Sequence, residues 1–317
     1  MGAPALRRQP EPAAPIVQVA PIAPSALKGL LLELNDLKRI RSAGRDGSVA
    51  ARLFRSAWAA LVAGERGDDV AFRVTAAAVA AARLGDLSFG ALQDLGLSAE
   101  EARAVLRASF DEVSDAVAEP LRSDLRSALG TEGREPVAVP AFVAALEAQP
   151  RAGVTCPGQP RIILEPPENH AEHCLLVAVY GALLAPAYDA DPTTVFVAGL
   201  AHHLHNAAMP DSGFTGEMLL GAHLAPVIER ATERALDELE PGLRADVVAA
   251  RRTLPDASTP EGRAFHAADV IDRVMQIAQH LKAANLTMDR VLGDMELVHD
   301  GPVKGFHDRV LGEMDLP

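Results

Sequence analysis

Apolar residues recur every three to four positions along most of the chain, which is the period of an amphipathic α-helix. Between residues 25 and 63 this pattern predicts two helices, separated by a turn near Gly44 to Gly47. A further helix is expected to open at Ser98, because Glu101 three residues later completes a capping-box pattern. The other helices predicted in this half cover residues 69–84, a short stretch from Ser88, and residues 137–146.

Two proline-rich segments interrupt the helical pattern. Residues 1 to about 25 contain six prolines and no periodic apolar face, which predicts a disordered or extended tail. Residues 149–167 contain five prolines and therefore exclude a regular helix. We interpret this second segment as a domain boundary, or as a long loop that lines a site. The predicted organisation is a tail at 1–25, a helical N-terminal domain of unknown role at 26–150 and a metal-binding domain at 151–317.

The helical period resumes after the second proline-rich segment. Residues 209–216 are rich in turn formers, and the sequence leaves open whether they form a lid or a plain connector. The fold class expected from the whole pattern is all-α. The helices predicted in this half cover residues 168–184, 192–207, 217–238, 241–253 and 260–283, followed by two shorter ones.

Composition supports a helical protein that acts on small molecules. Only 4% of the residues are aromatic and 49% are hydrophobic, which favours helices packed through aliphatic and small side chains. The formal net charge of -13 argues against nucleic acid or an anionic membrane as the main partner. We therefore expect a small-molecule substrate, anionic if a metal supplies the positive charge, and a homo-oligomer remains possible.

The two cysteines, Cys156 and Cys174, form neither a disulfide framework nor a paired-cysteine metal motif. Cys174 lies in an apolar run, where we expect a buried thiol. The N-terminal residues lack the continuous apolar core of an export signal, and no stretch is expected to span a bilayer. We therefore expect a cytoplasmic protein.

All ten histidines lie between His170 and His307, and five of them form two short clusters. His170 and His173 are three residues apart and share a helix face. His202 and His203 follow an almost wholly apolar helical stretch, where an unsatisfied imidazole would cost a few kcal/mol. Since imidazole is the commonest metal ligand in proteins, this concentration predicts a metal site.

Three motifs resemble those of the HD-domain superfamily of metal-dependent enzymes, over roughly residues 160 to 285. His173 lies in ENHAEHC, which is similar to the first motif of the family. His202 and His203 lie in AGLAHHLHNA, which resembles the His-Asp motif of the family in the apolar residues that precede the histidines. Asp269 lies in FHAADVIDR, which resembles the closing Ala-Asp motif. The resemblance implies a metal bound by His173, His202, His203 and Asp269.

His203 stands where the family places the aspartate of its His-Asp pair. An imidazole cannot bridge two metal ions as a carboxylate does, which argues against a conventional dinuclear site. Three nitrogen ligands and one carboxylate suit iron, manganese, zinc, cobalt or nickel better than magnesium. We expect a divalent transition metal, one or two ions per chain.

Other polar residues near these motifs are candidates for catalysis or further ligation. Asn206 lies near the position where some nucleotidases of the superfamily keep a catalytic glutamate. The candidate catalytic residues are Glu172, His205 and Asn206, with Glu217 as a further possible base. The possible additional ligands are His170, His223 and His266, and the candidate cations for a substrate phosphate are Arg161, Arg273 and Lys282.

Three functions are compatible with this sequence. The first is a metal-dependent hydrolase of a phosphate ester or nucleotide-like molecule, in which the metal activates a water. The second is an iron oxygenase, which the surplus of histidines would fit and the loss of the bridging aspartate argues against. The third is an HD-like domain that has lost catalysis and serves as a ligand-binding or interaction module.

Overall fold

The computed structural model describes residues 23–131, 138–284 and 287–316. These residues form α-helices joined by loops and short 3₁₀ or π turns, without any extended strand, so the predicted all-α fold is confirmed. Most of the predicted tail lies outside the described residues; a 3₁₀ turn begins at Pro24. The helices of the first half are α1 (Lys28–Asn35), α2 (Val49–Val62), α3 (Gly67–Leu84), α4 (Phe89–Asp94), α5 (Ala99–Val113), α6 (Leu121–Ala128) and α7 (Ala141–Ala148).

The second half begins with a long loop, residues 149–169, and continues with seven helices among the described residues. Within the loop, the backbones of Val154 and Ile162 pair through hydrogen bonds of 3.0 and 2.9 Å. These helices are α8 (His170–Leu184), α9 (Pro192–Ala201), α10 (Gly213–Leu220), α11 (Leu224–Leu236), α12 (Pro241–Arg251), α13 (Pro260–Ala284) and α14 (Lys304–Glu313).

Local signals explain where several helices begin and end. The capping box predicted at Ser98 and Glu101 is present, and α8 opens with a second one between Asn169 and Glu172. The turn between α1 and α2 contains Gly44 and Gly47 with φ of +74° and +75°, a conformation that glycine adopts without a steric penalty.

Three helix predictions are wrong in their bounds by more than two residues. The helix predicted over 192–207 ends at Ala201, and residues 204–207 form a 3₁₀ turn. The helix predicted over 217–238 is divided at Gly221, whose φ of +49° breaks the right-handed helix. The helix predicted from 137 begins only at Ala141, after Pro140. Helix α6 was not predicted, because its eight residues offer only a brief apolar period.

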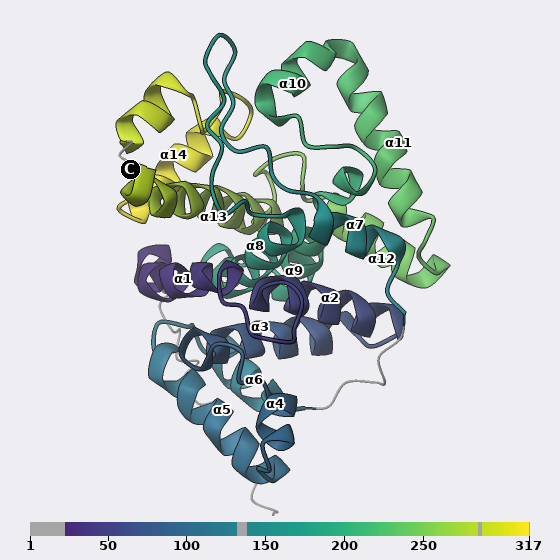
Figure 1. Cartoon of the computed structure of the whole chain (residues 1–317), viewed down its shortest axis with the longest axis vertical. Helices are drawn as coiled ribbons and strands as arrows, with labels where there is room; N and C mark the ends of the chain where they lie inside the picture. The colour runs from purple at the N-terminus through teal and green to yellow at the C-terminus, as the bar shows by residue number, and fades with distance from the viewer. Residues whose placement is uncertain (1–22, 132–137, 285–286, 317) are drawn as a thin grey trace, which may run out of the picture.

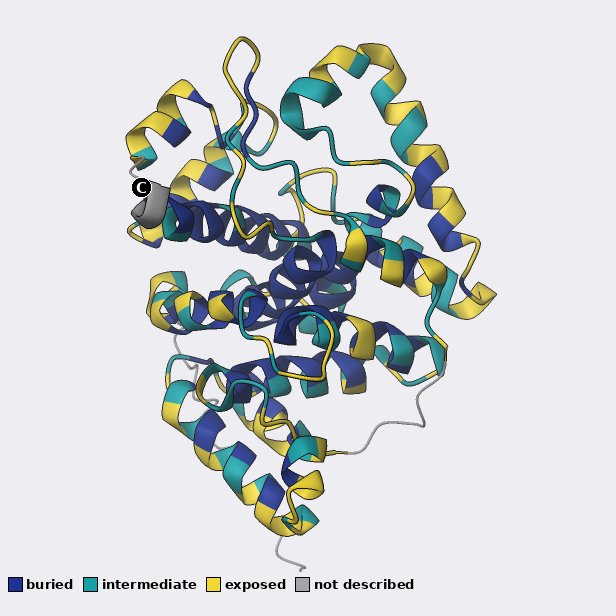
Figure 2. Ribbon diagram, in the orientation of Figure 1, coloured by how far each residue is buried: buried dark blue, intermediate teal, exposed yellow. Residues whose placement is uncertain are grey.

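Helices α8, α9 and α13 form the centre of the molecule (Figures 1 and 2). Every residue of α8 is buried, as are residues 195–201 of α9. Helices α2 and α3 of the first half pack against α8, and α3 also contacts α9. The Tyr180 hydroxyl of α8 donates to the Leu31 carbonyl of α1 over 2.6 Å. One continuous apolar core therefore includes residues from both halves of the described chain.

The expectation that no stretch could span a bilayer needs a correction. By length and composition alone, residues 170–188 pass the criterion for a membrane span. In the structure 83% of that apolar window is buried inside the protein, as is usual for the core helix of a globular fold.

Gly199 allows α8 and α9 to pack closely. A Cβ at this position would lie 2.5 Å from the Cα of Ala178 and 2.6 Å from its backbone nitrogen. Because neither helix backbone can move without disturbing the core, we expect Gly199→Ala to destabilise the protein by about 1–3 kcal/mol. Urea unfolding monitored by circular dichroism measures this change.

Gly242 provides the matched control for this substitution. It lies in α12, and a Cβ there would have no neighbour within 4 Å. Gly242→Ala should leave stability unchanged or raise it by up to about 1 kcal/mol, since alanine favours a helix. Equal stability of the two variants would contradict the close packing of α8 on α9.

Candidate metal centre

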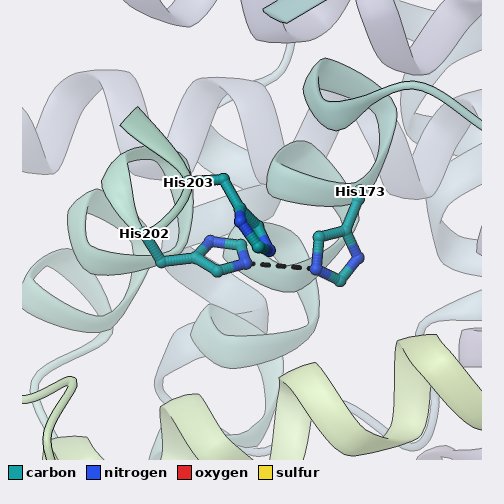
Figure 3. A group of neighbouring side chains, drawn as sticks. All are labelled: His173, His202 and His203. Atoms are coloured by element: carbon teal, nitrogen blue, oxygen red, sulfur yellow. Dashed lines mark hydrogen bonds between the residues drawn. The ribbon is translucent and has the colours of Figure 1, made fainter. Parts of the chain in front are cut away.

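Three segments bring the candidate ligands together. His173 lies in the first turns of α8, His202 and His203 directly follow α9, and Asp269 lies on α13. Adjacent residues in a continuous helix point about 100° apart. Because α9 ends at Ala201, the two neighbouring imidazoles can both turn toward His173, as Figure 3 shows.

The distances between these side chains are short. The Nε2 atoms of His173 and His202 are 3.1 Å apart, and the Nε2 atom of His173 lies 3.3 Å from Oδ1 of Asp269. Ligand atoms of His173, His202 and His203 all lie within 4.8 Å of one another. The structure thus brings all four predicted metal ligands into one site.

The hydrogen bonds of His173 and His202 define where each ring carries its proton. The Nδ1 atom of His173 donates to Oδ2 of Asp272 over 2.7 Å, and Nδ1 of His202 donates to the Gly199 carbonyl over 2.7 Å. Both acceptors lack a proton, so each Nδ1 carries a hydrogen and each Nε2 faces the centre, where the two Nε2 atoms lie within hydrogen-bonding distance of each other. With both rings neutral, their Nε2 lone pairs would face each other at this distance, and a cation beside both would relieve the repulsion.

This donor set fits a transition metal. Adjacent nitrogen ligands on one zinc or similar ion, bound at 2.0–2.1 Å, lie about 2.8–3.4 Å apart, which includes the distance between the two Nε2 atoms. Oδ1 of Asp269 is buried and has no hydrogen-bond partner among the described residues, which leaves it available for coordination.

The charges at the site favour metal binding. Burial, with a further contribution from His173, lowers the pKa of His202 well below its usual value, so its ring is neutral at physiological pH. Burial alone would raise the pKa of Asp269, but the Arg273 guanidinium and His173 hold it well below its ordinary value. Neutral imidazoles and an ionised carboxylate are the protonation states that coordinate a metal.

His203 is held differently from the other two histidines. Its Nδ1 atom donates to Oδ1 of Asn206 over 2.8 Å, and its Nε2 atom accepts from Nη1 of Arg151 over 3.2 Å. The Asn206 amide is fixed in turn by a 3.1 Å bond to the Met209 carbonyl. The lone pair of His203 is therefore shared with a guanidinium, and His203 can coordinate a metal only when Arg151 moves away.

A second group of possible ligands adjoins His173. Glu168 and Asp272 have oxygen atoms within 4.8 Å of a His173 nitrogen and of each other. However, Nζ of Lys38 lies 2.5 Å from Oε1 of Glu168 and 2.7 Å from Oδ1 of Asp272. The ammonium group already pairs with both carboxylates and occupies their shared side.

A cavity of about 200 Å³ lies beside His203. It is bordered by the loop at 149–169, the start of α10, the middle of α13 and residues 297–299, so the proline-rich loop lines this cavity. Arg151 and Arg273 both contribute guanidinium groups to its wall. The remaining polar wall is formed by Glu168, Asp211, Glu217, Gln276 and His299, and the apolar wall includes Val154, Ile163, Leu164, Phe214, Ile277 and Leu297.

The candidate catalytic residues have separate surroundings. The Glu172 carboxylate accepts from the Asn169 backbone and from the Ser48 hydroxyl, so it serves the helix cap, and burial raises its pKa. Asn206 binds His203. The His205 ring lies 5.4 Å from the His203 ring, and burial together with Arg251 lowers its pKa to about 4.

The additional candidate ligands are distributed around the centre. The fully buried His170 has its ring 4.8 Å from that of His203 and its Nε2 atom 3.5 Å from Oδ2 of Asp211. His266 is buried on α13 with its ring 5.7 Å from that of His307. His223 is exposed before α11, outside the group of converging ligands.

Of the candidate cations, Arg273 lies at the site, because its Nη2 atom donates a 2.6 Å hydrogen bond to Oδ2 of Asp269. Arg161 is exposed and donates to the backbone carbonyls of Ala152 and Ser212. The side chain of Lys282 lies outside the described residues. Arg151, which contacts His203 directly, was not predicted, because its proline-rich surroundings indicated only a boundary or a loop.

Asp211 was also missed. Its Oδ2 accepts from the Ala152 backbone over 2.9 Å, and its Oδ1 accepts from the Gly213 backbone over 2.9 Å. Asp211 thereby ties the turn-rich segment 209–216 to the loop that carries Arg151. The only signal in the sequence was its position in a turn segment close to the second histidine cluster.

Comparison with known families agrees with this geometry. Residues 143–300 match the HD domain family. This range contains His173, His202, His203 and Asp269. This part of the chain is therefore an HD domain, and the protein belongs to the HD-domain superfamily of metal-dependent, phosphohydrolase-like proteins. No curated protein and no solved structure matched the chain.

Proposed function

We propose that this protein is a metal-dependent phosphohydrolase that acts on a small phosphate ester or nucleotide-like molecule. The observation that carries the proposal is the position of the two facing Nε2 atoms and Asp269 next to a cavity that contains two guanidinium groups. The HD domain supports the same class of reaction.

His173, His202 and Asp269 would hold the metal, with His203 as a fourth ligand when Arg151 releases it. A metal bound there would lower the pKa of a coordinated water and polarise a phosphoryl oxygen. The Asp272 carboxylate and the Gly199 carbonyl hold the two imidazole rings in the tautomer that directs Nε2 toward the centre.

Arg151 would bind the substrate phosphate. Its side chain is 21% exposed, and its guanidinium contacts His203, which lines the same cavity. A guanidinium offers paired N–H donors that match phosphate oxygens. Arg273 pairs closely with Asp269, at 2.6 Å, whereas Nε of Arg151 lies 3.7 Å from Oε2 of Glu168, so Arg151 is the cation that is freer to turn toward a ligand.

The charge distribution favours one ion over two. Besides the histidine group, the described residues offer one other set of converging ligands, Glu168, His173 and Asp272, and Lys38 already pairs with both of its carboxylates. A two-iron oxygenase would need that second set to be free. The hydrolase therefore has more support than the oxygenase.

Phosphate release by the reconstituted protein tests the proposal. Metal-free protein would be loaded separately with Mn, Fe, Co, Ni or Zn and assayed on p-nitrophenyl phosphate, nucleoside monophosphates and sugar phosphates. We expect hydrolysis with at least one metal and none without metal. Binding of a metal without phosphate release from any of these esters would contradict the hydrolase and favour a ligand-binding module.

A further inference from the structure

Lys38 connects the N-terminal segment to the candidate metal centre. It ends the 3₁₀ turn Asp36–Lys38 that follows α1, more than a hundred residues before the HD domain begins. Only 4% of Lys38 is exposed, although lysine is rarely buried unless it is paired. Such a burial calls for a specific partner.

The partner of Lys38 is the carboxylate that orients His173. Nζ of Lys38 lies 2.7 Å from Oδ1 and 2.9 Å from Oδ2 of Asp272, which is fully buried on α13. Oδ2 of the same carboxylate accepts the Nδ1 proton of His173 over 2.7 Å. Lys38, Asp272 and His173 thus form one chain of charge-assisted hydrogen bonds.

Other contacts limit the freedom of this carboxylate further. Nδ2 of Asn35 lies 3.5 Å from Oδ1 of Asp272, and Lys38 also forms an ion pair with Oε1 of Glu168 at 2.5 Å. With both oxygens occupied by Lys38, Asp272 cannot turn Oδ2 away from His173 without breaking a buried ion pair.

We propose that Lys38 is a positioning residue of the metal centre. By fixing Asp272, it holds the His173 ring so that Nε2 faces His202 and Asp269, and the N-terminal segment is thereby an integral part of the site. Carboxylates that accept a proton from a metal-bound histidine fix its orientation and raise its basicity. The proposal rests on the proposed metal site, but it does not depend on the reaction performed there.

The neighbouring Arg39 offers a matched control. Its Nη2 atom donates to Oε1 of Gln276 over 2.8 Å, so it joins the same N-terminal turn to the same helix, α13. It reaches Asp272 only indirectly, through Asn35, whose contact with Oδ1 is long at 3.5 Å. A role of Lys38 in docking the segment would be shared by Arg39. A role in positioning His173 would not.

Metal affinity measured by competition with a chromophoric chelator tests the proposal, with Co²⁺ and Zn²⁺ as probes. The full-length proteins compared are the wild type, Lys38→Met, Asp272→Asn, the double variant and Arg39→Met, each checked by circular dichroism. We expect Lys38→Met and Asp272→Asn each to weaken binding about 10–100-fold. The double variant should bind as Asp272→Asn does, and Arg39→Met should bind like the wild type.

Three results would overturn the proposal. One is wild-type affinity in a folded Lys38→Met protein, and another is a loss in Arg39→Met equal to that in Lys38→Met. The third is a double variant that binds clearly more weakly than Asp272→Asn, since Lys38 would then act by another route. The comparison of the double variant with Asp272→Asn remains decisive if Lys38→Met alone does not fold. In Lys38→Met the buried Asp272 carboxylate loses its cation, whereas in the double variant that carboxylate is replaced by a neutral amide.

Because the experiment measures metal affinity and not phosphate release, it tests the role of Lys38 separately from the proposed function. A wild-type protein that binds metal without hydrolysing phosphate esters leaves the Lys38 comparison intact. A wild-type protein that binds neither Co²⁺ nor Zn²⁺ would overturn both.

Discussion

His202→Ala is expected to weaken the binding of a first-row divalent metal by more than about 100-fold. Loss of a residue that only orients a ligand costs about 10–100-fold, and loss of the ligand itself should exceed this. His202 contributes the Nε2 atom that faces His173 at 3.1 Å, and its Nδ1 atom is already bound to the Gly199 carbonyl. Dialysis followed by plasma emission spectroscopy, together with chelator competition, measures the change.

His223→Ala is the matched control for this loss. It removes the same side chain from an exposed position before α11, outside the group of converging ligands. We expect the metal content of this variant to equal that of the wild type. Equal metal content in the His202 and His223 variants would show that the metal binds elsewhere.

The second large effect is expected for Arg151→Met. Removing a preorganised donor that stabilises developing charge typically lowers kcat about 10²–10³-fold. Arg151 lines the cavity and contacts His203, but it contributes no metal ligand. The kcat for the ester that the wild type hydrolyses best should therefore fall while the metal remains bound.

Metal affinity distinguishes this role from a structural one. Since Arg151→Met frees the lone pair of His203, any change in metal affinity should be an increase. Arg161→Met is the control, because Arg161 lies in the same loop, is exposed and bonds only backbone carbonyls in the described part of the chain. Unchanged kcat in Arg151→Met, or an equal loss in Arg161→Met, would contradict a phosphate-binding role for Arg151.

The sequence predicted the parts of the site that local periodicity controls. His173 and Asp269 lie on long helices whose inward faces are defined by apolar spacing, and the structure brings them together. The exact end of α9 was not predictable, since no glycine or proline lies between Ala201 and Pro210 and Leu204 keeps the helical spacing of the apolar residues. That end matters, because it lets His202 and His203 turn toward the same side.

The surroundings of the ligands depend on contacts between distant segments. Lys38 and Asp272 are 234 residues apart, and Arg151 and His203 are 52 apart. The spacing of either pair in the sequence does not indicate a contact, because the tertiary packing of loops and helices brings the two residues together. Lys38 had the pattern of an exposed basic residue at the end of a helix, and Arg151 that of a loop residue among prolines.

The most direct test of the account is a crystal structure of the metal-loaded protein with anomalous scattering recorded at the metal edge. We expect one ion, about 2.0–2.2 Å from Nε2 of His173, Nε2 of His202 and an oxygen of Asp269. The Lys38 ammonium should remain on Asp272. An ion bound between Glu168 and Asp272 with Lys38 displaced, or loaded crystals without an anomalous peak at the histidines, would contradict it.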